Sequence, residues 1–116
     1  MKDIMMTKVN DMRDRYIKIE KLNIAFIQAS DVVYGNNSID QISNAWNQVQ
    51  MLTVLMVNEY LEIRKVREEL MDMVNKYSFL IPTEDLIIVK DALAETLPIA
   101  EKSMKILGEY IEKINA

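Results

Sequence analysis

Cysteine and histidine are both absent from this sequence of 116 residues. Without cysteine the chain forms no disulfide, offers no thiolate nucleophile and cannot bind zinc or an iron–sulfur cluster through sulfur. Without histidine it lacks the side chain that most often serves as a general base and as a transition-metal ligand. These absences exclude several classes of enzyme, and the sequence predicts no catalytic residue, no metal ligand and no cofactor.

Glycine and proline are scarce, with two residues of each, so sharp turns are poorly supplied. Half of the residues are hydrophobic and 28% are charged, which is typical of a globular protein. Strong helix formers such as leucine, methionine, glutamate and lysine dominate the composition. This balance and the length predict one all-α domain over residues 1–116.

Long hydrophobic runs are missing as well. The longest, Met51–Val57, contains Thr53 and is far shorter than the roughly 20 residues that cross a bilayer. The first residues carry charge where a signal peptide needs an apolar segment. The net charge of −4 argues against nucleic acid as a partner. We therefore expect a cytoplasmic protein with no membrane or nucleic-acid partner.

Three segments show the spacing of three and four residues between apolar positions that is typical of amphipathic helices. The first covers about residues 3–34 and ends at Gly35, which can take the left-handed conformation that ends a helix, as the asparagines after it can. The second starts after Ser38, which with Gln41 matches a capping box, and ends near residue 77. The third follows Thr83, the predicted N-cap, and contains Pro98. We expect Pro98 to kink this helix or to split it in two.

Short loops between three long helices predict an elongated, antiparallel up-down-up three-helix bundle, with helices on the order of 45–55 Å long. A heptad seam is predicted to face the core from the second helix. It comprises Ile39, Ile42, Trp46, Val49, Thr53, Met56, Tyr60, Ile63, Arg67, Leu70, Val74 and Tyr77. The predicted core stripe of the third helix comprises Leu86, Leu93, Leu97, Ala100, Met104, Leu107, Ile111 and Ile114, with Val89 or Lys90 at the remaining position.

The middle of the second helix is apolar all round, because Thr53 is the only polar residue from Met51 to Val57. Two interpretations remain open: this stretch is the deepest part of the core, or it is a surface for self-association or for a partner. The predicted interface comprises Trp46, Met51, Leu52, Val54, Leu55 and Met56. Trp46 can serve either as a core anchor or as an interface hot spot.

Two acidic pairs on the second helix support a different hypothesis. Glu59-x-x-Glu62 and Glu69-x-x-Asp72 each project from one face, and such carboxylates can bind Mg²⁺. They resemble the paired acidic motifs of all-α nucleoside triphosphate pyrophosphohydrolases, although that family places its motifs on two facing helices. Surface salt bridges, Arg64–Glu68 and Lys65–Glu69, are the simpler explanation.

The sequence therefore predicts a non-enzymatic protein–protein interaction module, such as an adaptor, an assembly factor or an inhibitor. It would form a homodimer or dock a protein partner through the apolar surface of the second helix. The alternative is a Mg²⁺-dependent nucleotide pyrophosphohydrolase that uses the two acidic pairs.

Overall fold

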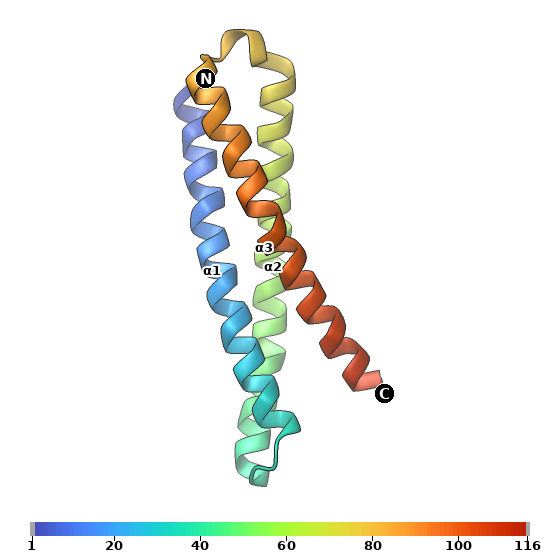
Figure 1. Cartoon of the computed structure of the whole chain (residues 1–116). Coiled ribbons are helices and arrows are strands. Elements are labelled where there is room, and N and C mark those ends of the chain that lie inside the picture. The colour runs from blue at the N-terminus through green and yellow to red at the C-terminus, as the bar shows by residue number, and fades with distance from the viewer. Residues whose placement is uncertain (1, 116) are drawn as a thin grey trace.

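The computed structural model describes residues 2–115, with the side chains of residues 3–99, 101–110, 112 and 113. The helices are α1 (Lys2–Tyr34), α2 (Ile39–Tyr77) and α3 (Thr83–Asn115), and a 3₁₀ turn, η1 (Ser78–Leu80), lies between α2 and α3. Figure 1 shows α1 and α3 starting at the same end of the molecule, while α2 runs the opposite way. The expected all-α, elongated up-down-up bundle is confirmed, with extents of 60 × 23 × 17 Å.

The start of α2 is the predicted capping box. Ser38 Oγ accepts a hydrogen bond from the Gln41 backbone N–H at 3.2 Å, and the Ser38 N–H donates to Gln41 Oε1 at 3.1 Å. The prediction for α3 was one residue off. The Leu86 N–H donates to the Pro82 carbonyl oxygen at 3.0 Å, so Pro82 holds the N-cap position and Thr83 is the first helical residue.

The loop after α1 corrects the prediction for Gly35, because no glycine among the described residues has a positive φ. A Cβ atom at this position would lie 2.7 Å from the Asp31 carbonyl oxygen and 2.8 Å from Asn37 Nδ2. The Asn37 amide donates to the Val32 carbonyl oxygen at 3.1 Å, which holds the turn closed. Glycine is therefore needed at this position because a Cβ atom would not fit, and not because the backbone is left-handed.

The core consists of two clusters, one in each half of the bundle. The cluster near the α2–α3 turn contains Met5, Val9, Met12, Tyr16, Ile19, Ile63, Val66, Leu70, Ile81, Val89 and Ala92. The other contains Phe26, Ala29, Val49, Leu52, Met56, Leu107 and Tyr110. In this second cluster the Phe26 ring packs edge-on against Tyr110 at 5.1 Å, and Trp46 lies 6.4 Å from the same ring. Burial raises the pKa of the Tyr110 hydroxyl.

The buried face of α2 only partly follows the predicted seam. The residues that it buries are Ala45, Val49, Leu52, Met56, Glu59, Ile63, Val66 and Leu70. The predicted ends of the seam were wrong: Ile39 is 86% exposed, and Tyr77 is also exposed. Both lie at the ends of α2.

α3 continues through Pro98 as one bent helix, which confirms the kinked alternative. Its predicted core stripe was wrong in part, because Leu97 is 44% exposed and Met104 is exposed as well. Ala100, Ile111 and Ile114 lie outside the described side chains. The face that α3 buries comprises Asp85, Val89, Ala92, Thr96, Ser103, Leu107 and Tyr110.

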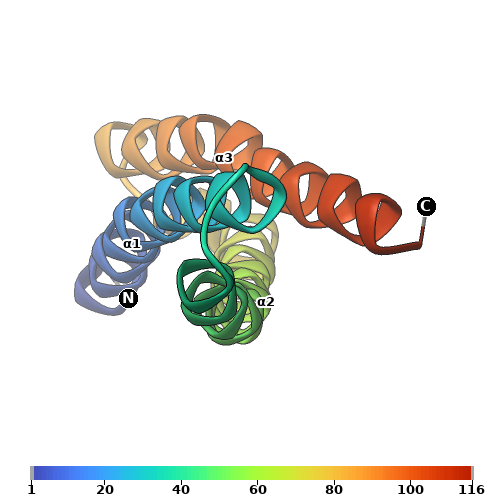
Figure 2. The ribbon, with the colours of Figure 1, turned by 90° about the horizontal axis from the view of Figure 1, so that it is seen from below.

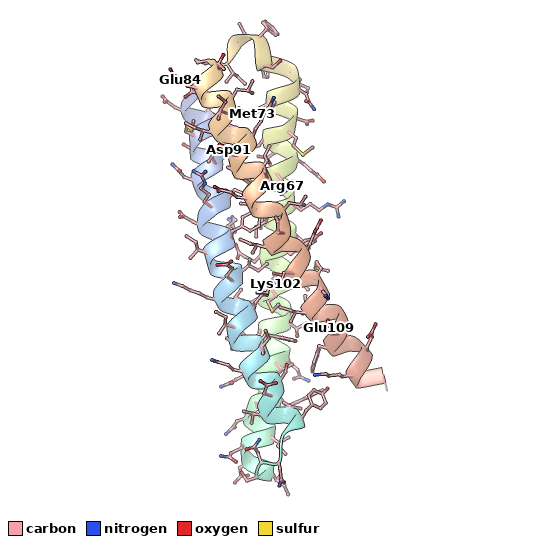
Figure 3. The ribbon with its side chains drawn as sticks, in the orientation of Figure 1. Arg67, Met73, Glu84, Asp91, Lys102 and Glu109 are labelled. Atoms are coloured by element: carbon pink, nitrogen blue, oxygen red, sulfur yellow. The ribbon has the colours of Figure 1, made fainter. Side chains whose placement is uncertain are left out.

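Hydrogen bonds explain why the more polar face of α3 turns inward. Asn23 Nδ2 of α1 donates to Ser103 Oγ at 2.9 Å, and Arg67 Nη1 of α2 donates to Thr96 Oγ1 at 3.1 Å. Arg67 of α2 donates to the Leu93 carbonyl oxygen, at the level where α2 and α3 run close together (Figure 3). α3 packs more extensively against α1 than against α2. Its C-terminal part angles away from the rest of the bundle (Figures 1 and 2).

Candidate interaction surface

The apolar stretch in the middle of α2 is divided between core and surface. Leu52 is buried and Met56 is fully buried at 0% exposure, so these two predicted interface residues pack inside the bundle. Val54 is 59% exposed, and Met51 and Leu55 are exposed as well. Val57 and Leu61 extend this surface. We call Met51, Val54, Leu55, Val57 and Leu61 the α2 belt.

Trp46 does not belong to the belt. Its half-buried indole packs against the second core cluster, which contains Phe26 and Met56, and lies near the Tyr110 ring. The interpretation of the whole Met51–Val57 stretch as deep core was also wrong, because a three-helix bundle covers only one side of α2.

All of the belt except Leu61 lies in a part of α2 that carries no charge. Residues 41–58 contain no aspartate, glutamate, lysine or arginine, whereas 28% of the whole chain is charged. The exposed polar residues of this segment are Gln41, Ser43, Asn44, Asn47, Gln48, Gln50 and Asn58. Charge returns immediately afterwards, with Glu59, Glu62, Arg64 and Lys65. Depletion of charge is the compositional mark of an interface core.

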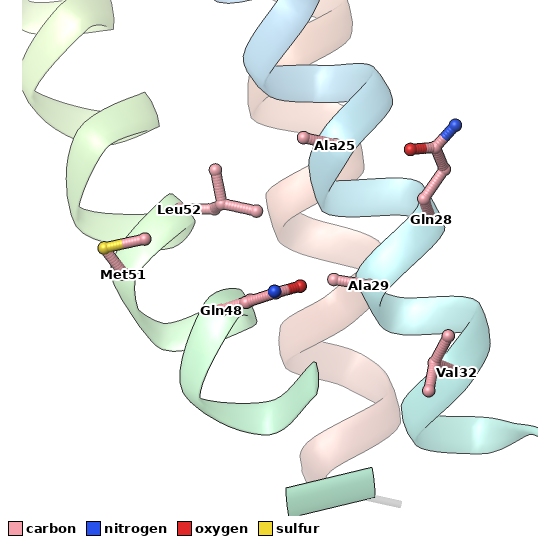
Figure 4. A pocket seen from close by; sticks show the side chains of 7 residues that line it. All are labelled: Ala25, Gln28, Ala29, Val32, Gln48, Met51 and Leu52. Atoms are coloured by element: carbon pink, nitrogen blue, oxygen red, sulfur yellow. The ribbon is translucent and has the colours of Figure 1, made fainter. Parts of the chain in front are cut away.

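A groove runs beside the belt, between α1 and α2 (Figure 4). Its volume is about 390 Å³, and it is lined by Ala25, Gln28, Ala29, Val32, Gln48, Met51 and Leu52. Figure 4 shows Leu52 and Gln48 of α2 pointing towards Ala25 and Ala29 of α1, whose side chains are short. The two glutamines provide amide donors and acceptors at an otherwise apolar site.

Further along the same side, ion pairs bridge α1 and α2. Arg15 Nη1 lies 2.7 Å from Glu59 Oε1, and Lys18 Nζ lies 3.2 Å from Glu59 Oε2. The hydrogen bond to Glu59, and then the bond to Asp11, raises the pKa of the Arg15 guanidinium. Glu69 pairs with Lys8 instead of with Lys65. Glu59 is only 6% exposed, so its interpretation as a surface residue was wrong.

The four carboxylates of the hydrolase hypothesis are not brought together. Glu59 and Glu69 are engaged by cationic side chains of α1, while Glu62 and Asp72 are exposed. Across residues 2–115 the structure shows no cluster of three acidic side chains that could hold a metal ion. The predicted surface pair Arg64–Glu68 is present at 3.2 Å.

Comparison with protein-family models, curated proteins and solved structures finds no match for this chain. Among the described residues, no helix has an apolar segment long enough to span a membrane.

Sequence reasoning missed two parts of this surface. Leu61 lies beyond the apolar stretch, but it is one heptad after Val54 and so shares its outward face. The groove could not be predicted, because Ala25 and Ala29 match the spacing of any helical core position. The length of the charge-free segment, readable directly from the sequence, is the signal that could have found the surface.

Proposed function

We propose that this chain is a non-enzymatic protein–protein interaction module and that the α2 belt, together with the adjacent α1–α2 groove, is its docking surface. The observation that carries the proposal is an exposed apolar belt, four of whose five residues lie in the charge-free segment 41–58 of α2. Large apolar side chains gathered on one face are costly to leave in water and typically mark interaction sites.

The chemistry of the surface defines the partner that fits it. Val54 and Leu61 form a ridge one heptad long, and the groove beside it is floored by Ala25 and Ala29. An amphipathic helix could place its apolar side chains along this ridge and groove. Gln28 and Gln48 could hydrogen-bond polar groups at its edge. Since no charge lies along the belt from Met51 to Val57, the matching surface is expected to be uncharged at its centre.

The Met51–Val57 stretch supports binding more than catalysis. Its exposed residues provide no nucleophile, general base or acidic cluster, because they are aliphatic or carry a thioether. The neighbouring Glu59 is held by Arg15 and Lys18 in a contact that joins α1 to α2. We assign that contact to the stability of the bundle.

Site-specific photo-crosslinking tests the proposal in cells that produce the chain. A benzophenone amino acid at Val54 is expected to form adducts with a protein, identified by mass spectrometry. The matched control carries the same group at Glu109, an exposed residue on the C-terminal part of α3 (Figure 3). If adducts at position 54 do not exceed those at position 109, the belt is not a docking surface and the proposal fails.

A further inference from the structure

We infer that a second copy of this chain occupies the α2 belt, with the two α2 helices packed antiparallel about a two-fold axis at Val54. This inference rests on the proposed function and names the partner. Three observations support it: the order of residues around Val54, the placement of charges along α2, and the dimensions of the bundle.

Three and four residues from Val54, within about one helical turn, the outward face of α2 has the same chemistry on both sides. Three residues before and after it lie the apolar Met51 and Val57, and four residues before and after it lie the amides of Gln50 and Asn58. All four are exposed. A helix advances about 100° per residue, so all four lie within about 60° of Val54 on the helix surface.

A two-fold axis makes use of this symmetry. In an antiparallel pair centred on Val54, Met51 of one copy lies at the level of Val57 of the other, and Gln50 lies at the level of Asn58. At these levels apolar groups meet apolar groups and the amides, one turn from the axis, can exchange hydrogen bonds, whereas Leu61 lies at the level of Asn47. Residue i contacts residue j and j contacts i, as an isologous interface requires. A different protein would impose no such symmetry on α2.

The charges on α2 favour the antiparallel orientation. In a parallel pair Arg64 would face Arg64 and Lys65 would face Lys65, which is unfavourable. In the antiparallel pair these two residues lie at the level of Asn44 and Ser43 of the other copy, which are uncharged. Because each copy carries a net charge of −4, the charge-free segment 41–58 is also a place where two copies can approach without direct repulsion.

The dimensions of the bundle argue against association at its end. Phe79 and Leu80 form an exposed apolar tip at the α2–α3 turn. The end of the bundle measures 23 × 17 Å, on the order of 400 Å², against the roughly 800 Å² per partner of a stable interface. The long sides measure 60 × 23 Å and 60 × 17 Å, on the order of 1,400 and 1,000 Å², so either has room for such an interface. The belt lies on a long side.

Cysteine cross-linking tests this geometry, since the chain contains no cysteine of its own. The variant Val54→Cys places two thiols at the axis, where Cα atoms can approach within the roughly 4.4–6.8 Å that a disulfide needs. Under mild oxidation we expect it to form disulfide-linked dimers at least about tenfold faster than Phe79→Cys, because contact raises the effective concentration. Phe79 is the matched control, since it is apolar and 81% exposed.

Two further samples determine the orientation. Met51→Cys alone is expected to cross-link poorly, because its two copies lie on opposite sides of the axis. Mixed with Val57→Cys, it is expected to form the mixed dimer, which mass spectrometry identifies. Rapid self-linking of Met51→Cys would overturn the antiparallel pair and indicate a parallel one.

Equal rates for Val54→Cys and Phe79→Cys would overturn the second copy as the occupant. The proposed function would still stand if the crosslinker at position 54 captured a different protein in cells. Both the proposed function and the inference would fail only if position 54 also gave no photo-crosslinked adduct above the level of position 109. Circular dichroism of each variant confirms that the helices are intact.

Discussion

Glu59 occupies a core position of α2, where a carboxylate is costly unless it is paired. Arg15 and Lys18 contact its two oxygens, and Asp11 holds the other side of the Arg15 guanidinium at 3.2 Å. The sequence predicted salt bridges on α2 but not this one, because the spacing of three and four residues identifies partners only within a helix. Partners on α1 depend on how the two helices pack.

Replacing Arg15 with methionine is expected to lower the free energy of unfolding by about 1–3 kcal/mol, because it leaves the buried Glu59 carboxylate with Lys18 as its cation. Methionine keeps the apolar stem of the side chain. Asp11→Asn is the control: it touches only the exposed side of the pair and should cost less than about 0.5 kcal/mol. Urea denaturation measures both. Equal losses in the two variants would show that the buried Arg15–Glu59 pair stabilises the fold no more than the exposed Arg15–Asp11 pair does.

The number, bounds and direction of the helices could be predicted from sequence, because caps, turns and periodicity are local signals. The face that each helix buries could not. On α2 the predicted and observed seams both contain Val49, Met56 and Ile63, so the sequence fits either. On α3 the more hydrophobic stripe was chosen, but the buried Asn23 of α1 requires Ser103 opposite it. Such a pairing becomes visible only when the helices are placed side by side.

Charge substitutions on α3 test its orientation. Leu97→Glu should cost less than about 1 kcal/mol, because the side chain is already in contact with solvent. Leu107→Glu should cost more than about 3 kcal/mol, because it buries an unpaired carboxylate among Phe26, Met56 and Tyr110. Thermal and urea unfolding of the two variants give the comparison. A larger loss for Leu97→Glu would mean that α3 is rotated towards the predicted stripe.

The whole molecule is a long bundle whose three helices cover one another incompletely. α3 leans on α1 and leaves the outer side of α2 open, so the belt stays exposed along the middle of the bundle. The sequence predicted an apolar surface on α2, and of the residues that it named for this surface Met51, Val54 and Leu55 are exposed. It could not separate them from Leu52 and Met56, because an all-round apolar stretch does not show which side the other helices cover.

The solution mass of the purified chain, measured by light scattering from about 1 µM to about 1 mM, is the decisive test of whether a second copy covers the α2 belt. We expect the mass to rise to twice that of the chain. Val54→Glu should remain a monomer with unchanged helicity, because it places two like charges at the axis. Phe79→Glu, with the same added charge at the tip, should dimerise like the natural chain. A mass that never rises, or that rises equally in Val54→Glu, would contradict a belt covered by a second copy.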